Sequence, residues 1–290
     1  MKSLVLLMAL LLSAVPASAQ SVAAGKRPAA AQPKVPAKAD VEAVLKRVYG
    51  YDPSIQYKVL LVRQSPIPGM AEMLVQVKGE YHHLFLTPDG HYAIDGDMQP
   101  FGPDPYAVVR ARLSAADGLA RGPAKPAVTM VEFSDLQCPH CKESQPVVEK
   151  LAADFPGMRL VFQHYPLSSH PWAMKAAQYA DCAGRMNNAA AWKFIAAIFE
   201  GQNSIALAIA DDKLKELAGA SGLDANKLSA CAAAPATAAR VKKSMALGDS
   251  VGVMGTPSIF VNGRLLEGVA GIPYGQVKAI VQYEIAHAGK

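Results

Sequence analysis

The stretch V-E-F-S-D-L-Q-C-P-H-C, residues 131–141, decides how this chain folds. It continues an apolar run that begins at residue 128 and is typical of a short buried strand, and residues 142–155 after it have the pattern of a helix. A C-x-x-C pair between strand and helix puts the first thiol at the helix N-terminus, where unpaired N–H groups and the macrodipole favour a thiolate. The second cysteine lies one turn further in, close enough to attack a mixed disulfide on the first. We therefore predict that Cys138 is the nucleophile and Cys141 the resolving thiol.

The dipeptide between the cysteines fits this arrangement. Pro139 suits the first helical position because it has no N–H to leave unpaired. His140 would add a hydrogen-bond donor or a positive charge near the Cys138 sulfur, and this would make a disulfide there more oxidising. A zinc site needs four ligands, usually as two close pairs, and the other cysteines, Cys182 and Cys231, are isolated, so no metal is expected. The motif alone leaves an inert structural disulfide open.

The elements on either side of the motif predict an α/β domain over residues 125–290. A second buried strand follows at 158–164, and a long Ala-rich helical stretch covers about 170–248. A strand at 258–261, a tight turn at Asn262-Gly263 and a return strand at 264–268 form a hairpin, and a helix at 277–287 ends the chain. This order of elements is a thioredoxin-like skeleton with a helical insertion in its middle.

Several motifs resemble the DsbA family of thiol–disulfide oxidoreductases. They are residues 131–141, 166–171, 180–183 and 252–257, and the resemblance covers roughly 125–287. It implies a thioredoxin fold that donates disulfides to exported proteins, with a cis peptide bond before Pro257 and with the Thr256 backbone pairing to an extended substrate. An ordinary trans-proline at a strand edge is the alternative. The resemblance also implies that Glu132 relays protons to the resolving cysteine, against the alternative of a surface carboxylate on the strand.

The first folded unit, residues 40–101, is predicted to be a small α+β domain. Asp40 would cap a helix through Tyr49, with an apolar stripe of Val41, Val44, Leu45 and Val48. Strands are expected at 57–62, 73–77 and 82–86, and Pro88-Asp89-Gly90 supplies a turn to residues 92–94. Residues 84–97 resemble the dimerisation domain of the DsbC and DsbG isomerases, which implies a homodimer. A linker helix and a linker are expected over 102–124.

The N-terminus is typical of an exported protein. Lys2, an apolar run at 4–15 and Ala17-Ser18-Ala19 form a signal peptide over residues 1–19, and we expect cleavage after Ala19. The apolar run is too short for a membrane anchor, which needs roughly 20 apolar residues. Residues 20–39 are rich in Ala, Pro and Lys and are expected to be a flexible linker. The expected location is the periplasm.

The composition gives a second pair of cysteines, and the net charge of the chain indicates little about its partners. The formal net charge of +5 comes from dispersed basic residues, and no nucleic-acid motif accompanies them, so a nucleic-acid partner is not expected. In an oxidising compartment Cys182 and Cys231 could form a structural bridge or stay as separately buried thiols.

The sequence is compatible with three functions. No cofactor is expected, because the Cys138–Cys141 disulfide is itself the redox group. An oxidase would start with this disulfide formed and would need a DsbB-like membrane partner to reoxidise it. An isomerase would start reduced and need a DsbD-like partner. A dimeric chaperone for unfolded proteins is the alternative of another class.

Overall fold

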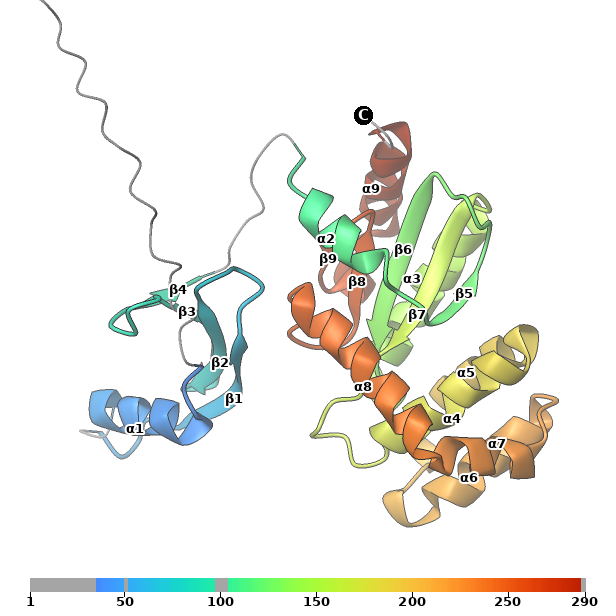
Figure 1. The fold of residues 1–290 in the computed structure, drawn as a ribbon, viewed down its shortest axis with the longest axis horizontal. Coiled ribbons are helices and arrows are strands. Elements are labelled where there is room, and N and C mark those ends of the chain that lie inside the picture. The colour runs from blue at the N-terminus through green and yellow to red at the C-terminus, as the bar shows by residue number, and fades with distance from the viewer. Residues whose placement is uncertain (1–34, 50–51, 97–103, 288–290) are drawn as a thin grey trace, which may run out of the picture.

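Two separate sheets organise the chain in the computed structural model, which describes residues 35–49, 52–96 and 104–287 (Figure 1). The first sheet has the strand order β1-β2-β3-β4, and the second has the order β5-β7-β6-β8-β9. The predicted signal peptide and most of the predicted linker at 20–39 lie outside the described residues.

The first sheet is antiparallel throughout and carries one helix. Its elements are α1 (Lys38–Tyr49), β1 (Tyr57–Gln64), β2 (Ala71–Val77), β3 (Glu80–Leu86) and β4 (Ala93–Asp95). Alternate residues of β1 and β2 point towards α1, so that Val59, Met73, Val75 and Val77 form a small core with Val41, Leu45 and Ile55. The Pro88-Asp89-Gly90 turn joins β3 to β4, and Gly90 has a positive φ of 72° there.

The start of α1 differs from the prediction that Asp40 caps it. The helix begins two residues earlier, at Lys38, so Asp40 lies inside its first turn. From there its carboxylate accepts a hydrogen bond of 3.0 Å from the Ala37 N–H, as the acidic residue of a capping box does. The predicted stripe is only half buried, because Val44 and Val48 are 60% and 51% exposed.

The segment between the sheets is more ordered than a linker. It contains α2 (Ala107–Leu113) and β5 (Leu119–Arg121), and β5 pairs antiparallel with β7 at the edge of the second sheet. The predicted linker at 102–124 is therefore wrong over these strand residues. Sequence pattern missed β5 because pairing, not its own periodicity, creates it. Gly118 and Gly122 flank it, and an added Cβ would lie 2.1 Å and 2.2 Å from carbonyl oxygens of β7.

The second sheet positions the cysteine motif. Its elements are β6 (Val128–Ser134), α3 (Pro139–Asp154), β7 (Met158–His164), β8 (Ser258–Val261), β9 (Arg264–Leu266) and α9 (Tyr274–His287). β6 and β7 are parallel neighbours joined by α3, while β8 and β9 form a hairpin through Asn262 and Gly263, both with positive φ. The return strand ends at Leu266 rather than residue 268, and α9 begins three residues before the predicted 277.

Helices cover both faces of this sheet. Val148 and Leu151 of α3 and Val277 and Val281 of α9 pack on one face. The other face is covered by Leu113 of α2 and by residues around the end of α8, which contact Phe133 and Phe260. Cys138 and Cys141 belong to neither layer and pack against the helical insertion instead.

The predicted helical insertion at 170–248 runs as five α-helices to Ser250. They are α4 (Ala173–Met186), α5 (Asn188–Gly201), α6 (Ala210–Ala220), α7 (Ala225–Ala233) and α8 (Pro235–Ser250), with short 3-10 turns at Gln202–Ser204, Leu207–Ile209 and, after β9, Val269–Gly271. Small residues such as Ala176, Ala180 and Ala183 let α4 pack closely against its neighbours. The insertion lies beside the sheet, with α8 returning to it (Figure 1).

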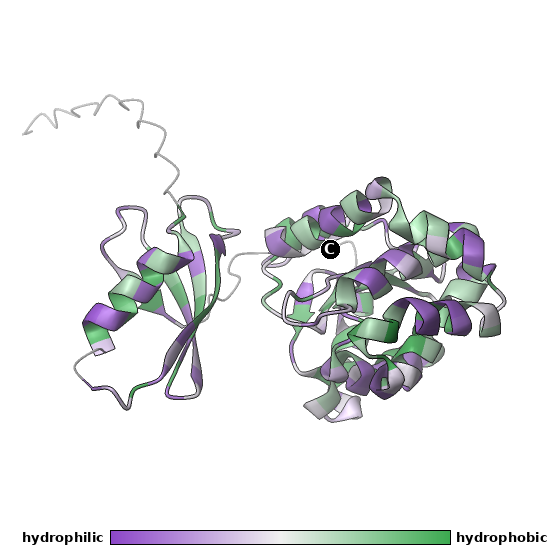
Figure 2. Cartoon of the chain, turned by 90° about the horizontal axis from the view of Figure 1, so that it is seen from below, coloured by the Kyte–Doolittle hydropathy of each residue, from purple (hydrophilic) through white to green (hydrophobic). Residues whose placement is uncertain are grey.

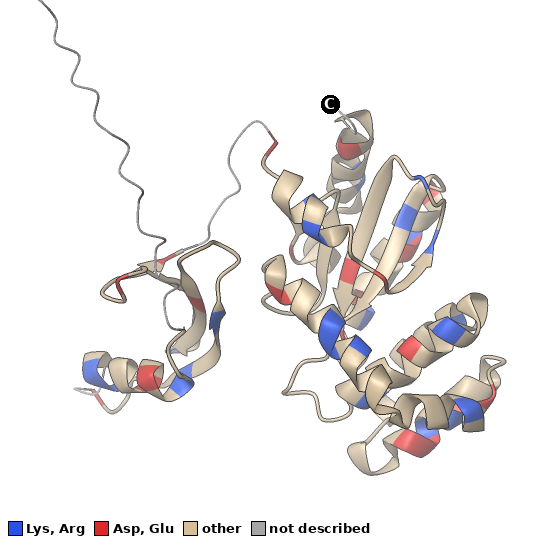
Figure 3. Cartoon of the chain, in the orientation of Figure 1, with Lys and Arg blue, Asp and Glu red and all other residues tan. Residues whose placement is uncertain are grey.

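Hydrophobic, acidic and basic residues are distributed over both parts of the chain. Figure 2 shows most helices with hydrophobic and hydrophilic residues interleaved, as amphipathic helices have. Acidic and basic residues alternate over both parts of the chain (Figure 3). None of the helices in the described part of the chain is long and apolar enough to cross a membrane.

Candidate active site

The cysteine motif lies at the junction of β6 and α3. Cys138 is the residue just before the helix, with extended backbone angles, and Pro139 occupies the first turn. Cys141 lies inside that turn and is fully buried, whereas Cys138 is 3% exposed. Both are free thiols in this structure. The strand and the helix therefore hold both sulfurs where the motif predicts them.

The surroundings of Cys138 stabilise its thiolate. Its pKa is lowered to about 5, first by a hydrogen bond from the Cys141 thiol, and further by the Cys141 N–H, the Thr256 side chain and the His140 N–H. Burial acts in the opposite direction and is outweighed. The pKa of Cys141 is raised strongly, first because the thiol is buried and then because it faces Cys138. Only Cys138 is poised to be ionised at neutral pH.

Reactivity of Cys138 should accordingly survive mild acid. The reduced protein is expected to react with iodoacetamide at Cys138 at a nearly constant rate from pH 8 to about pH 6, with half the thiolate lost near the pKa of about 5. An ordinary thiol, with a pKa of about 8.5, loses its thiolate over this whole range. Alkylation rates of Cys138 read by peptide mass spectrometry check this, and a midpoint near pH 8 would contradict the thiolate assignment.

His140 acts on Cys138 through its backbone N–H and through the charge of its ring. Its side chain is exposed, and its Nδ1 lies 2.9 Å from Glu143 Oε2, one turn further along α3. The pKa of His140 is raised, first by this contact with Glu143 and only then by the charge of Cys138. Its backbone N–H, rather than its ring, is the donor near the sulfur. The predicted donor near Cys138 is thus the His140 backbone N–H, while Glu143 holds the ring at the surface, where the charge of Cys138 still raises the pKa of the ring.

The loop before β8 faces the nucleophile. The Thr256–Pro257 peptide bond is cis. The Cys138 Sγ lies 3.3 Å from the Thr256 carbonyl oxygen, which accepts a hydrogen bond from the protonated thiol. Residues 118 positions apart are thus brought together, and the Thr256 backbone lies beside Cys138.

Glu132 is buried rather than on the surface of the strand, so the surface alternative is wrong. It lies on β6 with no exposure, and burial raises its pKa to about 7. Gln145 Nε2 donates to Glu132 Oε1 at 2.8 Å and to the Cys141 carbonyl oxygen at 3.3 Å. A carboxyl group that titrates near neutrality is therefore linked to the resolving cysteine through one residue, Gln145, which hydrogen-bonds to both.

Glu132 should lower stability at high pH. A raised folded pKa means that the penalty is absent below the unfolded value of about 4.5 and complete above about 7. Glu132→Gln is expected to make the reduced protein more stable by about 3 kcal/mol at pH 8 and by nearly nothing at pH 4. Urea unfolding at both pH values checks this. An equal change at both would show that Glu132 titrates normally.

Polar residues that the sequence did not predict hydrogen-bond to the cysteine motif and hold it in place. Asp135 donates its N–H to Cys141 Sγ at 3.3 Å, and its carboxylate accepts from the N–H groups of Gln137 and Leu167 and lies 2.7 Å from His170 Nδ1. Gln202 donates to the carbonyl oxygens of Leu136 and Cys138. Gln145 was recognisable from its position one turn after Cys141. Nothing in the sequence pattern links Gln202 to the motif, because the contact crosses the insertion.

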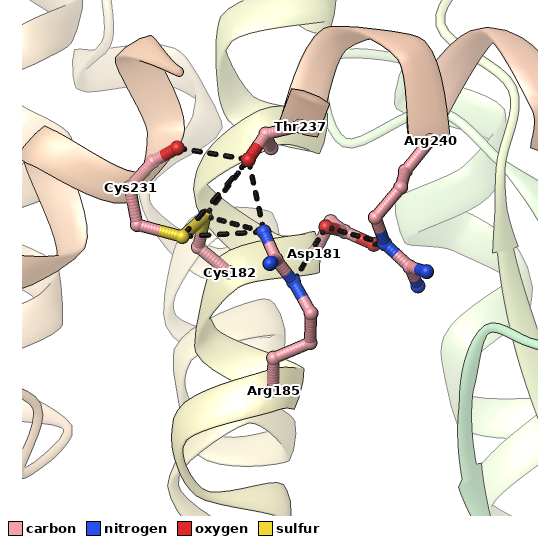
Figure 4. Close-up of a disulfide and its surroundings, with 6 residues drawn as sticks. All are labelled: Asp181, Cys182, Arg185, Cys231, Thr237 and Arg240. Atoms are coloured by element: carbon pink, nitrogen blue, oxygen red, sulfur yellow. Dashed lines mark hydrogen bonds and ion pairs between the residues drawn. A yellow bond between two sulfur atoms is a disulfide. The ribbon is translucent and has the colours of Figure 1, made fainter. Parts of the chain in front are cut away.

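Cys182 and Cys231 form a disulfide that ties α4 to α7 (Figure 4). Arg185 lies against both sulfurs, with its Nη2 at 3.1 Å from Cys182 Sγ and 3.2 Å from Cys231 Sγ. The same nitrogen donates to Thr237 Oγ1 at 2.9 Å, and Asp181 pairs with both Arg185 and Arg240. The bridge belongs to the insertion, apart from Cys138 and Cys141.

No group of three or more His, Cys, Asp or Glu side chains that could hold a metal ion occurs within residues 35–49, 52–96 and 104–287. His164 is buried on β7, and burial lowers its pKa to about 4, so it is neutral at pH 7. His170 pairs with Asp135 instead of coordinating anything.

Comparison with known proteins identifies the second part of the chain. The thioredoxin family model matches residues 114–281. The thioredoxin-like oxidoreductase from Silicibacter pomeroyi is 25% identical, with a TM-score of 0.51, over 63% of this chain and 97% of that one. The thiol–disulfide exchange protein α-DsbA2 from Wolbachia pipientis is 18% identical, with a TM-score of 0.54, over 63% and 99%. The predicted α/β thioredoxin-like fold with a helical insertion is confirmed.

A curated relative is the Na(+)/H(+) antiporter NhaA 3 of Salinispora tropica, which is 31% identical over 55% of this chain. The chain spans only 26% of that protein's length, and the other curated relatives it matches are covered to a similar extent. Since the family match begins at residue 114, it does not reach residues 84–97, and their resemblance to the DsbC and DsbG domain stays a prediction.

Proposed function

This chain belongs to the thioredoxin family and is a thiol–disulfide oxidoreductase, and from this premise we propose that it is an oxidase that donates disulfides to exported proteins in the periplasm. The observation that carries the proposal is the position of Cys138 at the N-terminus of α3, where the Cys141 thiol and nearby N–H groups lower its pKa. A stabilised thiolate is a stabilised reduced form, and a disulfide whose reduced form is stable is a strong oxidant.

The proposed exchange uses no group outside the chain. A substrate thiolate attacks Cys138 Sγ of the Cys138–Cys141 disulfide, a mixed disulfide forms, and Cys141 leaves and is protonated. Glu132, with a pKa of about 7, supplies this proton, and Gln145, which donates to Glu132 Oε1 and to the Cys141 carbonyl oxygen, holds the carboxyl near the resolving cysteine. A second substrate thiolate then attacks the substrate sulfur of the mixed disulfide, which releases the Cys138 thiolate. The substrate loses two electrons and the enzyme gains them. A DsbB-like membrane protein would reoxidise it.

The isomerase alternative has one observation in its favour. Thr256 precedes the cis-proline, as the resemblance to DsbC-type enzymes implies, and such an enzyme would be kept reduced by a DsbD-like partner. The same two cysteines would serve it. The homodimer and a chaperone role stay predictions, which light scattering of the intact protein and an aggregation assay of a Cys138→Ala/Cys141→Ala variant test.

The reduction potential of Cys138–Cys141 decides between oxidase and isomerase. Equilibration of the intact protein with glutathione buffers should give about −120 mV for the oxidase, and about −180 mV or lower would favour the isomerase. Thr256→Val is the matched variant, because it keeps the side-chain shape and removes the hydroxyl that stabilises the thiolate. The oxidase proposal expects its potential to be more negative than that of the wild type. If the intact protein shows no thiol–disulfide exchange that depends on Cys138, both functions are refuted.

A further inference from the structure

The first sheet contacts the second part of the chain through Arg63, near the end of β1. The guanidinium is 11% exposed and lies among groups from distant segments. Its Nη1 lies 2.8 Å from Asp249 Oδ1 in α8 and 3.3 Å from the Tyr165 hydroxyl, and its Nη2 lies 3.2 Å from Met254 Sδ. One side chain thus contacts both α8 and the segment that follows it.

Arg63 is held in this position from its own side. Its Nε pairs with Glu72 of β2, a carboxylate that is 2% exposed. A buried carboxylate without its cation carries a large desolvation cost, so Arg63 cannot leave Glu72 freely. The guanidinium is therefore fixed to the first sheet and presents its remaining nitrogens to Asp249 and Met254.

A second contact fixes the same segment. Arg112 of α2 donates to the Ser250 carbonyl oxygen and lies 3.4 Å from the carbonyl oxygen of Pro66, which follows β1. The Tyr165 hydroxyl donates to Asp249 Oδ1 at 2.6 Å and lies 3.3 Å from the Val253 carbonyl oxygen. Residues 249–254 are thus held between the first sheet, α2 and the end of β7.

This segment leads directly into the loop that faces the nucleophile. Met254 precedes Thr256 by two residues, and the Thr256 carbonyl oxygen lies 3.3 Å from Cys138 Sγ. We propose that Arg63 is a positioning residue for the cis-proline loop, so that the first domain sets where an extended protein substrate binds beside Cys138. The inference rests on the proposed function, because it concerns the same substrate site.

The expected consequence is specific to substrate binding. The Cys138 thiolate is stabilised mainly from within α3, by the Cys141 thiol, and Arg63 touches neither cysteine. Loss of Arg63 should therefore shift the loop, while the contact that lowers the pKa of Cys138 most, with the Cys141 thiol, stays in place. A peptide substrate that must lie along Thr256 should bind more weakly, whereas a small dithiol, which needs no strand pairing, should react as before.

A double-mutant cycle across the two parts tests this in the full chain. Arg63→Gln and Asp249→Asn are each expected to raise KM for a dithiol peptide about fivefold to tenfold, with kcat within about twofold. The double variant should lose little more than either single one, because both remove the same contact. Arg63→Lys, which keeps the charge, should recover part of the loss. Lys58→Gln, an exposed position on the same strand, is the matched control and should behave as wild type.

Each outcome bears on the proposal. Losses that multiply in the double variant, or equal losses with dithiothreitol and with the peptide, would overturn it. If Arg63→Gln unfolds because the buried Glu72 then keeps only the contact with His83 at 3.5 Å, Asp249→Asn still decides, since Asp249 is 50% exposed and its KM effect must appear alone. Wild-type protein that lacks exchange would refute the proposed function, whereas normal exchange with an unchanged KM in Asp249→Asn refutes only the role of Arg63.

Discussion

A Cys141→Ser variant is expected to lose turnover and, when mixed with a substrate protein that carries a disulfide, to accumulate as a mixed disulfide: the Cys138 thiolate attacks the substrate disulfide, one substrate thiolate leaves, and the other substrate sulfur stays bound to Cys138. Cys141 is fully buried one turn into α3, and its thiol is the group that hydrogen-bonds to Cys138. Of the four cysteines of the chain, Cys141 is the one placed to attack a disulfide formed on Cys138, and a serine hydroxyl is no nucleophile for that step. Non-reducing electrophoresis after mixing with a substrate protein would show the adduct, and mass spectrometry would place it on Cys138.

The matched control is Cys138→Ser. It leaves the buried thiol of Cys141 in place, with a pKa held far above neutral, and it should form no adduct at all. Substantial turnover by Cys141→Ser would mean that another thiol resolves the intermediate. An adduct on Cys141 in the Cys138→Ser protein would reverse the assigned roles.

Removal of the Cys182–Cys231 bridge is expected to cost about 4 kcal/mol of folding stability. The bridge closes a separation of 49 residues, and the loss of chain entropy in the unfolded state grows with the length of that loop. In Cys182→Ala/Cys231→Ala, α4 and α7 keep their apolar contacts, but the crosslink that ties them in the unfolded chain is gone. Urea unfolding without reductant should show a lower midpoint and a steeper slope, because the unfolded chain without the crosslink exposes more surface.

Cys138→Ala/Cys141→Ala is the natural comparison for this measurement. It also removes a pair of cysteines, but the loop between them is too short for its closure to matter much to the unfolded chain. Its unfolding free energy in the absence of reductant should therefore stay closer to that of the wild type. Equal losses in the two double variants would mean that packing of the sulfurs, not loop closure, accounts for the effect.

Sequence reasoning succeeded where local pattern carries the structure. The strand at 258–261 and its Asn262-Gly263 turn were predicted at their observed positions, because a short apolar run and a turn with two positive φ angles are properties of neighbouring residues. The cysteine motif was equally local, since the strand, proline and helix around Cys138 are consecutive.

Sequence reasoning failed where a distant partner decides. Strand β5 exists because β7 pairs with it, and Val44 and Val48 look like core residues but face away from the sheet. His140 has the right place in the chain for a donor to Cys138, yet Glu143 holds its ring at the surface. A local pattern shows which residues of a helix are apolar, but it does not show which of them contact another element.

The sequence by itself predicted which residues form the candidate site: a thiol at a helix N-terminus, a second thiol one turn away and a proline at the head of a strand. The tertiary structure decided how strongly they react and what lies beside them. Burial of Glu132, the approach of Thr256 to Cys138 and the contact of Arg63 with Met254 all join residues far apart in the chain. A pKa depends on desolvation and neighbouring charge, and only folding supplies both.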